Sequence, residues 1–355
     1  MVPQLRTMKI LVIKRDKIGD LLLTTPMLAH LKASRPEAQV HLLANDYNAW
    51  VVAGNPHVDR LWIYRRVRHR GRVSLTAAWE LLWQNVALGR ERFDWLIVAN
   101  GDESPRAVKR ALAIGGKRIV ARCEDAKRYP GLSDPLPPDR GGHEVDRLTA
   151  MLVPLGISPP AQPILPRYTL PEESAAFARA WLAERGLAPG GYVVLGLGAR
   201  RAKKQPSTAQ VLAWSAWWKK EHDLDTVFMW TPGRSDDPLY PGDDEVAQPV
   251  LDARVPHVHA HRGPVQEALG LIWSARTSVF PDSGLMQFAA ASPGGVLGLF
   301  AESDVSPGPA QWAPRGRRAD YLEAKKSVAE LPEAIVCDRL AVLLAPSACR
   351  RKSPD

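Results

Sequence analysis

Apolar residues along the first half of the chain follow two alternating patterns. Short runs rich in Val, Ile and Leu predict strands, and the longer segments between them carry apolar residues at helical spacing. The expected strands are 10–14, 40–44, 61–64, 95–99 and 118–121, and the expected helices are 21–31, 75–88, 105–114 and 144–155. This alternation is typical of a parallel sheet covered by helices, the doubly wound Rossmann-like arrangement.

The second half repeats the alternation after a proline-rich stretch. Strands are expected at 192–197, 226–230, 258–260, 277–280 and 296–300, and helices at 172–184, 208–221, 245–251, 265–275 and 285–291. We therefore predict a first domain at 1–156, an interdomain connection at 157–190, a second domain at 191–331, and a C-terminal helix and basic tail at 332–355. Two such halves should face each other across a cleft, with the carboxyl ends of their strands pointing into it.

Composition and charge limit the compartment and the partners. Cys123, Cys337 and Cys349 have no CxxC spacing, which argues against a disulfide framework or a zinc site and favours a cytoplasmic protein. The N-terminal apolar run ends after four residues, too short for a signal peptide or a membrane span, so we expect a soluble protein. A net charge of +9 favours nucleic acid, an anionic membrane face or phosphorylated substrates.

The first candidate site is the turn between the first strand and the helix that follows it. Gly19 permits a tight turn there, and Asp20 begins the helix at the edge of the sheet where ligands bind in such folds. Asp20 has two interpretations, a helix cap or a general base that accepts a proton from a hydroxyl group. Lys14 and Arg15 precede it as candidate phosphate contacts. The turn lacks the G-x-G-x-x-G fingerprint, which disfavours a nicotinamide-dependent oxidoreductase.

Two further candidate sites follow strands of the second half. Ser283, Gly284 and Leu285 offer backbone N–H groups at a helix start, which suits a diphosphate, and Asp282 could accept sugar hydroxyls or cap the helix. No G-x-S-x-G elbow surrounds Ser283, so a serine nucleophile is disfavoured. A basic loop follows the strand at 192–197 and could neutralise a diphosphate or simply be solvated. Its cations are Arg200, Arg201, Lys203 and Lys204.

Five arginines fall within 65–72, directly after the third expected strand. Arg65, Arg66 and Arg68 are candidate contacts for a phosphorylated acceptor or for anionic lipid headgroups, because arginine binds phosphate in a bidentate manner. A solvated loop is the alternative. Nucleic acid is not expected, because no helix-turn-helix, zinc-finger or aromatic-interleaved motif accompanies the arginines.

Together these segments resemble glycosyltransferase family 9, the heptosyltransferases of lipopolysaccharide core synthesis. The resemblance lies in 18–26, in 143–148 with 155–157, in 203–206 and in 282–284, in the family's order. It implies the GT-B fold, an acceptor-binding N-terminal domain, a C-terminal domain that binds the nucleotide sugar, and inversion without a metal or another cofactor. It also implies that Asp20 is the catalytic base, that Lys203 binds phosphate and that 282–284 hold the donor.

The resemblance implies a transferase that moves heptose from ADP-heptose to a lipopolysaccharide core or related surface glycan, in the cytoplasm or at the inner face of the inner membrane. The sequence departs from the family pattern at Gln205, where tryptophan is frequent, and at Gln287, where histidine is common. Asp237 and Glu245 are the candidates for the acid that binds the donor ribose, and Trp312 is a candidate for the nucleotide end of the site. The alternatives are a glycosyltransferase that uses another nucleotide sugar and a non-catalytic basic binding protein.

Overall fold

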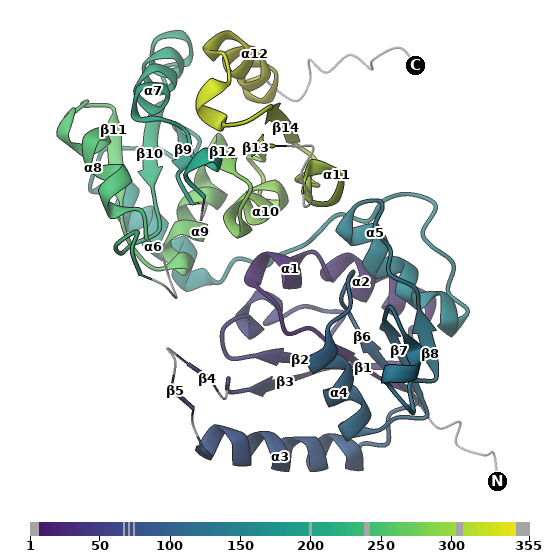
Figure 1. Cartoon of the computed structure of the whole chain (residues 1–355). Coiled ribbons are helices and arrows are strands. Elements are labelled where there is room, and N and C mark those ends of the chain that lie inside the picture. Colours follow the sequence, from purple (N-terminus) through teal and green to yellow (C-terminus); the bar gives the residue numbers. More distant parts are fainter. Residues whose placement is uncertain are drawn as a thin grey trace. The chain divides into compact units, whose positions relative to one another are not determined.

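The computed structural model describes residues 7–66, 68–69, 72–73, 75–198, 201–237, 242–302 and 308–345. The chain divides into two compact units, Met1–Thr169 (unit 1) and Leu170–Asp355 (unit 2). Each unit is built around a six-stranded parallel sheet with helices on both faces (Figure 1). The predicted pair of Rossmann-like α/β domains is confirmed. Within the described ranges, no helix is long and apolar enough to cross a membrane.

The sheet of unit 1 has the order β3-β2-β1-β6-β7-β8. Val12 pairs with Leu42 on one side and with Ile97 on the other, so β1 lies inside the sheet and residues 10–13 are fully buried. A strand covered on both faces needs apolar side chains at every position, which explains the continuous run of Ile, Leu and Val. The strands are β1 (Lys9–Ile13), β2 (Gln39–Asn45), β3 (Arg60–Tyr64), β6 (Trp95–Val98), β7 (Arg118–Arg122) and β8 (Asp134–Leu136).

Two helical layers cover this sheet. α3 and α4 pack together on one face, and α2 and α5 pack together on the other (Figure 1). A short hairpin precedes α3. The helical elements are α1 (Ile18–Leu22), α2 (Thr25–Ser34), η1 (Ala49–Val52), α3 (Leu75–Arg90), α4 (Pro105–Ile114), η2 (Ala126–Arg128), α5 (Glu144–Thr149) and η3 (Ala150–Leu155), and the hairpin strands are β4 (Arg68–His69) and β5 (Arg72–Val73).

Two expected helices of unit 1 differ in the structure. The single helix expected at 21–31 is wrong, because α1 ends at Leu22 and α2 begins at Thr25, with Pro26 in its first turn. Proline has no N–H to donate and fits the first turn of a new helix better than the interior of a continuous one. The helix expected at 144–155 becomes the 3₁₀-helix η3 after Thr149, and Pro154 lies within it.

The sheet of unit 2 has the order β11-β10-β9-β12-β13-β14. α7 and α12 pack on one face, and α6, α9 and α10 lie on the other (Figure 1). The elements are α6 (Glu172–Ala183), β9 (Tyr192–Gly196), η4 (Ala202–Lys204), α7 (Thr208–His222), β10 (Asp225–Met229), α8 (Asp244–Asp252), β11 (Val258–His261), α9 (Val265–Ser274), β12 (Thr277–Pro281), α10 (Gly284–Ala291), β13 (Val296–Ala301), α11 (Pro309–Trp312), β14 (Ala319–Ala324), η5 (Val328–Glu330) and α12 (Glu333–Leu344).

The sequence patterns did not predict the edge strands β8 and β14. An edge strand has one neighbour and partial solvent contact, so it does not need a continuous apolar run. β8 consists of Asp134, Pro135 and Leu136, and β14 has only two buried residues, Leu322 and Ala324. α12 ends at Leu344, and the basic tail expected at the C-terminus lies outside the described residues.

Candidate active site

In unit 1, the carboxyl end of β1 leads through a polar loop into α1. Asp20 is the third residue of α1, and its Oδ2 accepts a hydrogen bond of 3.0 Å from the backbone N–H of Lys17. The carboxylate therefore caps the helix start, as one of its two interpretations predicts. This bond occupies one of the two carboxylate oxygens, so capping and proton acceptance are compatible at the same residue.

Burial makes Asp20 a better proton acceptor than an ordinary aspartate. Burial raises the pKa of Asp20, the nearby cation of Lys14 opposes the shift, and the negative charge of Asp16 adds to it. Lys14 is itself buried, and its Nζ lies 3.1 Å from Asp16 Oδ2. Asn100, after β6, donates a hydrogen bond to the same Asp16 oxygen. Asp16 belongs to the site, and sequence analysis missed it.

Two buried asparagines, Asn45 at the end of β2 and Asn48 just after it, fix the loop that carries these charges. Asn45 Nδ2 donates to the carbonyl of Arg15 at 2.7 Å, and Asn48 Nδ2 donates to the carbonyl of Asp16 at 3.0 Å. Arg15 Nε donates to Tyr64 Oη, at the end of β3, at 2.9 Å. Residues from three adjacent strand ends thus hold one loop, which is the arrangement expected at the ligand-binding edge of a parallel sheet.

The arginines proposed as acceptor contacts have different environments. Arg65 Nη1 lies 3.4 Å from Glu80 Oε1, and Arg66 Nε lies 3.0 Å from Asp46 Oδ1. Both pairs are exposed and solvent-screened, so they hold the guanidinium groups only weakly. Arg68 lies in β4, and its side chain is outside the described part.

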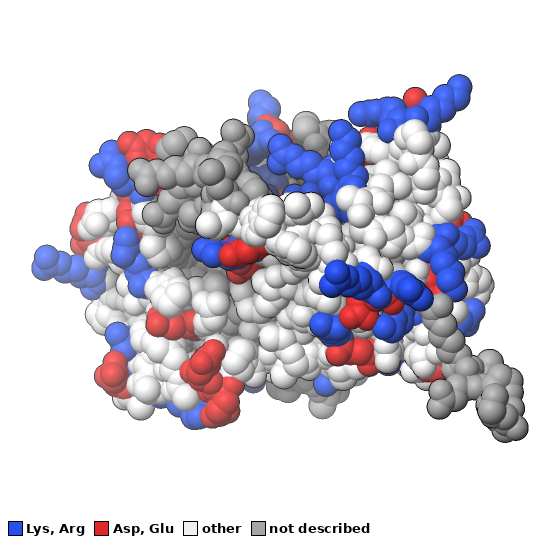
Figure 2. All heavy atoms as spheres, turned by 90° about the horizontal axis from the view of Figure 1, so that it is seen from below, with Lys and Arg blue, Asp and Glu red and all other residues white. Residues whose placement is uncertain are grey.

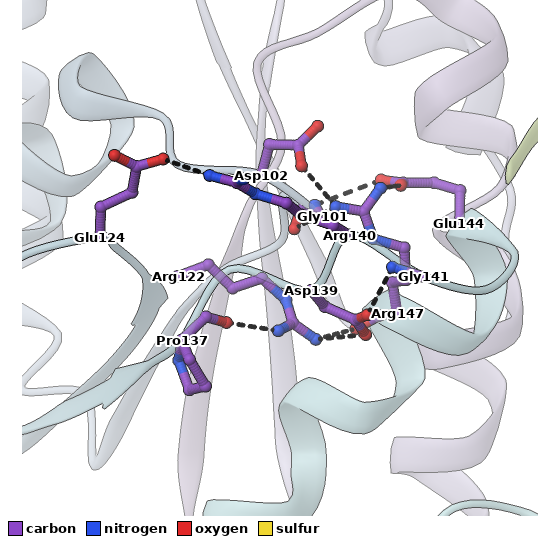
Figure 3. A network of polar contacts seen from close by, with 10 residues as sticks. All are labelled: Gly101, Asp102, Arg122, Glu124, Pro137, Asp139, Arg140, Gly141, Glu144 and Arg147. Atoms are coloured by element: carbon purple, nitrogen blue, oxygen red, sulfur yellow. Dashed lines mark hydrogen bonds and ion pairs between the residues drawn. The ribbon is translucent and has the colours of Figure 1, made fainter. Parts of the chain in front are cut away.

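A buried polar network holds the loop after β6 (Figure 3). Arg147 Nη1 lies 3.1 Å from Glu144 Oε2, and both side chains are almost fully buried. Arg147 also donates to the carbonyl of Gly101 at 2.7 Å, while the N–H of Gly101 donates to Glu144 Oε1 at 3.2 Å. A Cβ at Gly101 would lie within 3 Å of the ends of both side chains, so a larger residue there would displace them. The segment at 143–148 therefore has a structural role, clamping the loop next to Asn100.

In unit 2, two strand ends bring the basic loop beside the turn after β12. β9 and β12 are neighbours, with Leu195 opposite Val279. Gly196 ends β9, and a Cβ there would lie 2.1 Å from the ring of Phe280, so only glycine lets this ring pack against the strand. Lys204, in η4, makes an ion pair with Asp282.

The two lysines of η4 are bound to different carboxylates. Lys203 pairs with Glu302, which follows β13 and adopts a left-handed backbone conformation with φ of 54°. Lys204, and not Lys203, is therefore the lysine that contacts the 282–284 turn. No local sequence pattern indicates Glu302, because the pair joins positions 99 residues apart. Arg201 is exposed, and Arg200 lies outside the described residues.

The turn after β12 leads directly into α10. Ser283 is the N-cap, and its Oγ accepts a hydrogen bond of 3.4 Å from Met286 N. Gly284 and Leu285 follow in the first turn, where backbone N–H groups have no acceptor within the helix and the helix dipole favours an anion. Gln287 is buried, and its Nε2 donates to the carbonyl of half-buried Trp312 at 2.8 Å.

The acidic residues at the start of α8 accept several hydrogen bonds. Arg262 and the indole N–H of Trp230 donate to Asp244 and hold the pKa of its carboxyl well below its usual range. Asp243 accepts a 2.6 Å hydrogen bond from Gln205, and burial raises the pKa of Asp243. The two acids singled out from the sequence lie nearby: Glu245 accepts from Ser235 N at 2.9 Å, and Asp237 is exposed.

The two units and their order along the chain define a two-domain α/β protein of the GT-B type. More particularly, the chain has the fold of solved structures of glycosyltransferase family 9, as the resemblance implied. The structure of a family 9 glycosyl transferase from Veillonella parvula superposes with a TM-score of 0.80 at 18% identity, covering 95% of this chain and 97% of that one. No protein-family model matches the chain, and no curated protein sequence matches it.

Two Escherichia coli structures show the same fold. ADP-heptose LPS heptosyltransferase II matches with a TM-score of 0.73 at 19% identity, over 95% of this chain and 98% of that one. The heptosyltransferase WaaC, in a structure with ADP, matches with a TM-score of 0.72 at 17% identity, over 95% of this chain and the whole of that one. The similarity therefore extends over both units.

Proposed function

We propose that this protein is a glycosyltransferase of family 9 that transfers heptose from ADP-heptose to an acceptor sugar with inversion and without a metal. The observation that carries the proposal is the fold, which matches structures of such transferases over 95% of the chain. The order of the family-like segments, from 18–26 to 282–284, supports the same conclusion. A different nucleotide sugar remains the alternative donor.

In this proposal, unit 2 binds the donor. Its diphosphate lies on the first-turn N–H groups of α10 and on Lys203 and Lys204, which would exchange their carboxylate partners for phosphate oxygens. Asp282, released from Lys204, then accepts hydrogen bonds from sugar hydroxyls. The lysines and the helix dipole stabilise the negative charge that develops on the leaving ADP, which is the electrostatic task that a divalent ion performs in other transferases.

Unit 1 binds the acceptor, which we propose to be a lipopolysaccharide core sugar or a related surface glycan. Asp20 removes the proton from the attacking hydroxyl, and that oxygen bonds to the anomeric carbon on the face opposite ADP, so the configuration inverts. The cations of Arg15, Arg65, Arg66 and Arg68 contact phosphate groups of the acceptor. Lys14, predicted as a further phosphate contact, is buried against Asp16 and is left out of this set. The reaction takes place in the cytoplasm, at or near the inner face of the membrane that carries the acceptor.

A thermal-shift panel tests the donor assignment. ADP and ADP-heptose are expected to raise the melting temperature by several degrees at about 100 times their dissociation constant, since ligand at that excess stabilises the native state by about 2.7 kcal/mol. UDP and GDP serve as matched controls with the same diphosphate. A larger shift with UDP or GDP would reassign the nucleotide. No shift with any nucleotide, together with salt-dependent retention on DNA, would favour a basic binding protein instead.

Substitution of the two η4 lysines tests the diphosphate site. Lys203→Met and Lys204→Met are each expected to weaken ADP binding by about 10- to 100-fold, because each removes a charge-assisted contact. Lys220→Met is the matched control, since Lys220 is highly exposed at the end of α7. Isothermal titration calorimetry measures the three affinities. Equal affinity in all three variants would exclude both η4 lysines from the donor site.

A further inference from the structure

The outward face of α3 carries an apolar stripe that the core does not explain. Trp79, Leu82, Trp83 and Val86 recur at helical spacing, and they are 61%, 55%, 53% and 40% exposed. The opposite side of the helix already contributes to the core, where Leu88 is fully buried. α3 is therefore apolar on two sides, and packing against the sheet accounts for only one of them.

The tryptophans make this stripe unusual for the protein. Their two rings lie 5.9 Å apart in an edge-to-face arrangement. The other ten of the 12 tryptophans are buried or half-buried. Single exposed apolar residues are ordinary on a protein surface, but a contiguous apolar stripe marks a surface that contacts another molecule.

Arginines outnumber acidic residues within 60–90, while Asp59 and Glu91 border this segment and Glu91 pairs with Arg60. Seven arginines, one glutamate and no lysine or aspartate fall within 60–90. The glutamate, Glu80, is paired with Arg65, and Arg90 is exposed at the carboxyl end of α3. Figure 2 views the molecule from the side of α3 and shows many uncharged atoms on this face, with lysines and arginines interspersed with aspartates and glutamates. A partner for this surface must accept both apolar side chains and arginine.

We propose that the α3 stripe, together with the exposed Arg60 and Arg90, docks on a bilayer that contains anionic phospholipid. The helix would lie in the plane of the interface, with Trp79 and Trp83 at the headgroup level, which tryptophan favours, and with the arginines on lipid phosphates. α3 has 16 residues and lies on the surface, so it would rest on the membrane and not span it. A second copy of the chain fits poorly, because a symmetric contact would bring two arginine-rich segments together.

Vesicle flotation tests this surface without any sugar substrate. The full chain is expected to float with phosphatidylcholine vesicles containing 30% phosphatidylglycerol. It should float far less with pure phosphatidylcholine vesicles, or with the anionic vesicles at high salt. Trp79→Ala/Trp83→Ala should weaken the partition coefficient at least about tenfold, since two large apolar side chains no longer enter the interface. Leu82→Glu, which places an acid within the stripe, should have a similar effect. The control Ile335→Ala/Val342→Ala removes exposed apolar side chains from α12 and should bind as the wild type does.

Two results would overturn the proposal. One is equal flotation of the wild type and both α3 variants. The other is a wild type that does not bind anionic vesicles and instead forms a dimer in sedimentation analysis. If Trp79→Ala/Trp83→Ala dissociates that dimer, the stripe is a self-association surface. The ADP-induced thermal shift, measured on every variant, reports folding and donor binding separately, so a failure of the membrane surface is distinguishable from a failure of the proposed transferase activity.

Discussion

Asp20→Asn is expected to lower turnover by about 10²- to 10⁴-fold, the usual cost of removing a general base, while ADP binding stays near that of the wild type. The carboxamide cannot take a proton from the acceptor hydroxyl. It does keep an oxygen in place of Oδ2, which accepts the hydrogen bond from Lys17 N. The variant therefore separates the two interpretations of this residue, because it removes the base and retains the cap. Steady-state kinetics with saturating donor measures the loss.

The cap provides the control for that experiment. Asp20→Ala removes both roles and should also cost about 1 kcal/mol of stability, a typical value for a lost helix cap, whereas Asp20→Asn should cost little. If Asp20→Asn retains normal turnover, Asp20 is a structural cap only, and another group must take the proton.

The wild-type pH profile gives a third, independent readout of Asp20. A base must be unprotonated to act, so kcat/KM should fall as pH falls through the pKa of Asp20 in the free enzyme. Burial, reinforced by Asp16, raises that pKa, so the acidic limb should lie above the ordinary aspartate value of 3.8. Below this limb the carboxyl is protonated and activity is lost. An acidic limb that is unchanged in Asp20→Asn would assign the titration to a different group.

Much of the fold could be predicted from the sequence because its signals are local. The central strands are buried on both faces, so each appears as an unbroken apolar run, and β1, β2 and β9 were all found within about one residue of their observed ends. The helix 105–114 was found with its observed ends, since proline starts it and glycine follows it. The edge strands β3 and β11 were predicted as well, but the edge strands β8 and β14 and the 3₁₀ segments lack such signals, because their stability comes from neighbours distant in the chain.

The candidate site was only partly predictable for the same reason. Strand order places the segments of Asp20, η4 and Asp282 at the ends of strands, which a pattern of alternating strands and helices can indicate. The pairing of side chains within the site depends on rotamers and on loops that no local pattern specifies. Glu302 and Asp16 were therefore missed, and the different partners of Lys203 and Lys204 could not be distinguished.

Arg147→Met is expected to destabilise unit 1 by about 3–5 kcal/mol, the cost of leaving one member of a buried ion pair without its partner. The substitution keeps much of the side-chain volume but removes every polar contact of the guanidinium group. Glu144 is 5% exposed and would retain only the N–H of Gly101 as a donor among the contacts shown in Figure 3. The loop after β6 would lose the bond to the carbonyl of Gly101 as well.

Arg140→Met is the matched control from the same network. Arg140 is 83% exposed, and its partner Glu124 is 62% exposed, so water solvates both groups before and after the change. An exposed pair of this kind contributes about 0–1 kcal/mol. Hydrogen–deuterium exchange of β6 and α5 in increasing urea measures the free energy of unfolding of unit 1 in both variants. The two arginines differ in burial and not in charge, so equal losses of stability would mean that the Glu144–Arg147 pair does not clamp the loop. A loss confined to Arg147→Met would establish that the 143–148 segment acts through this buried pair.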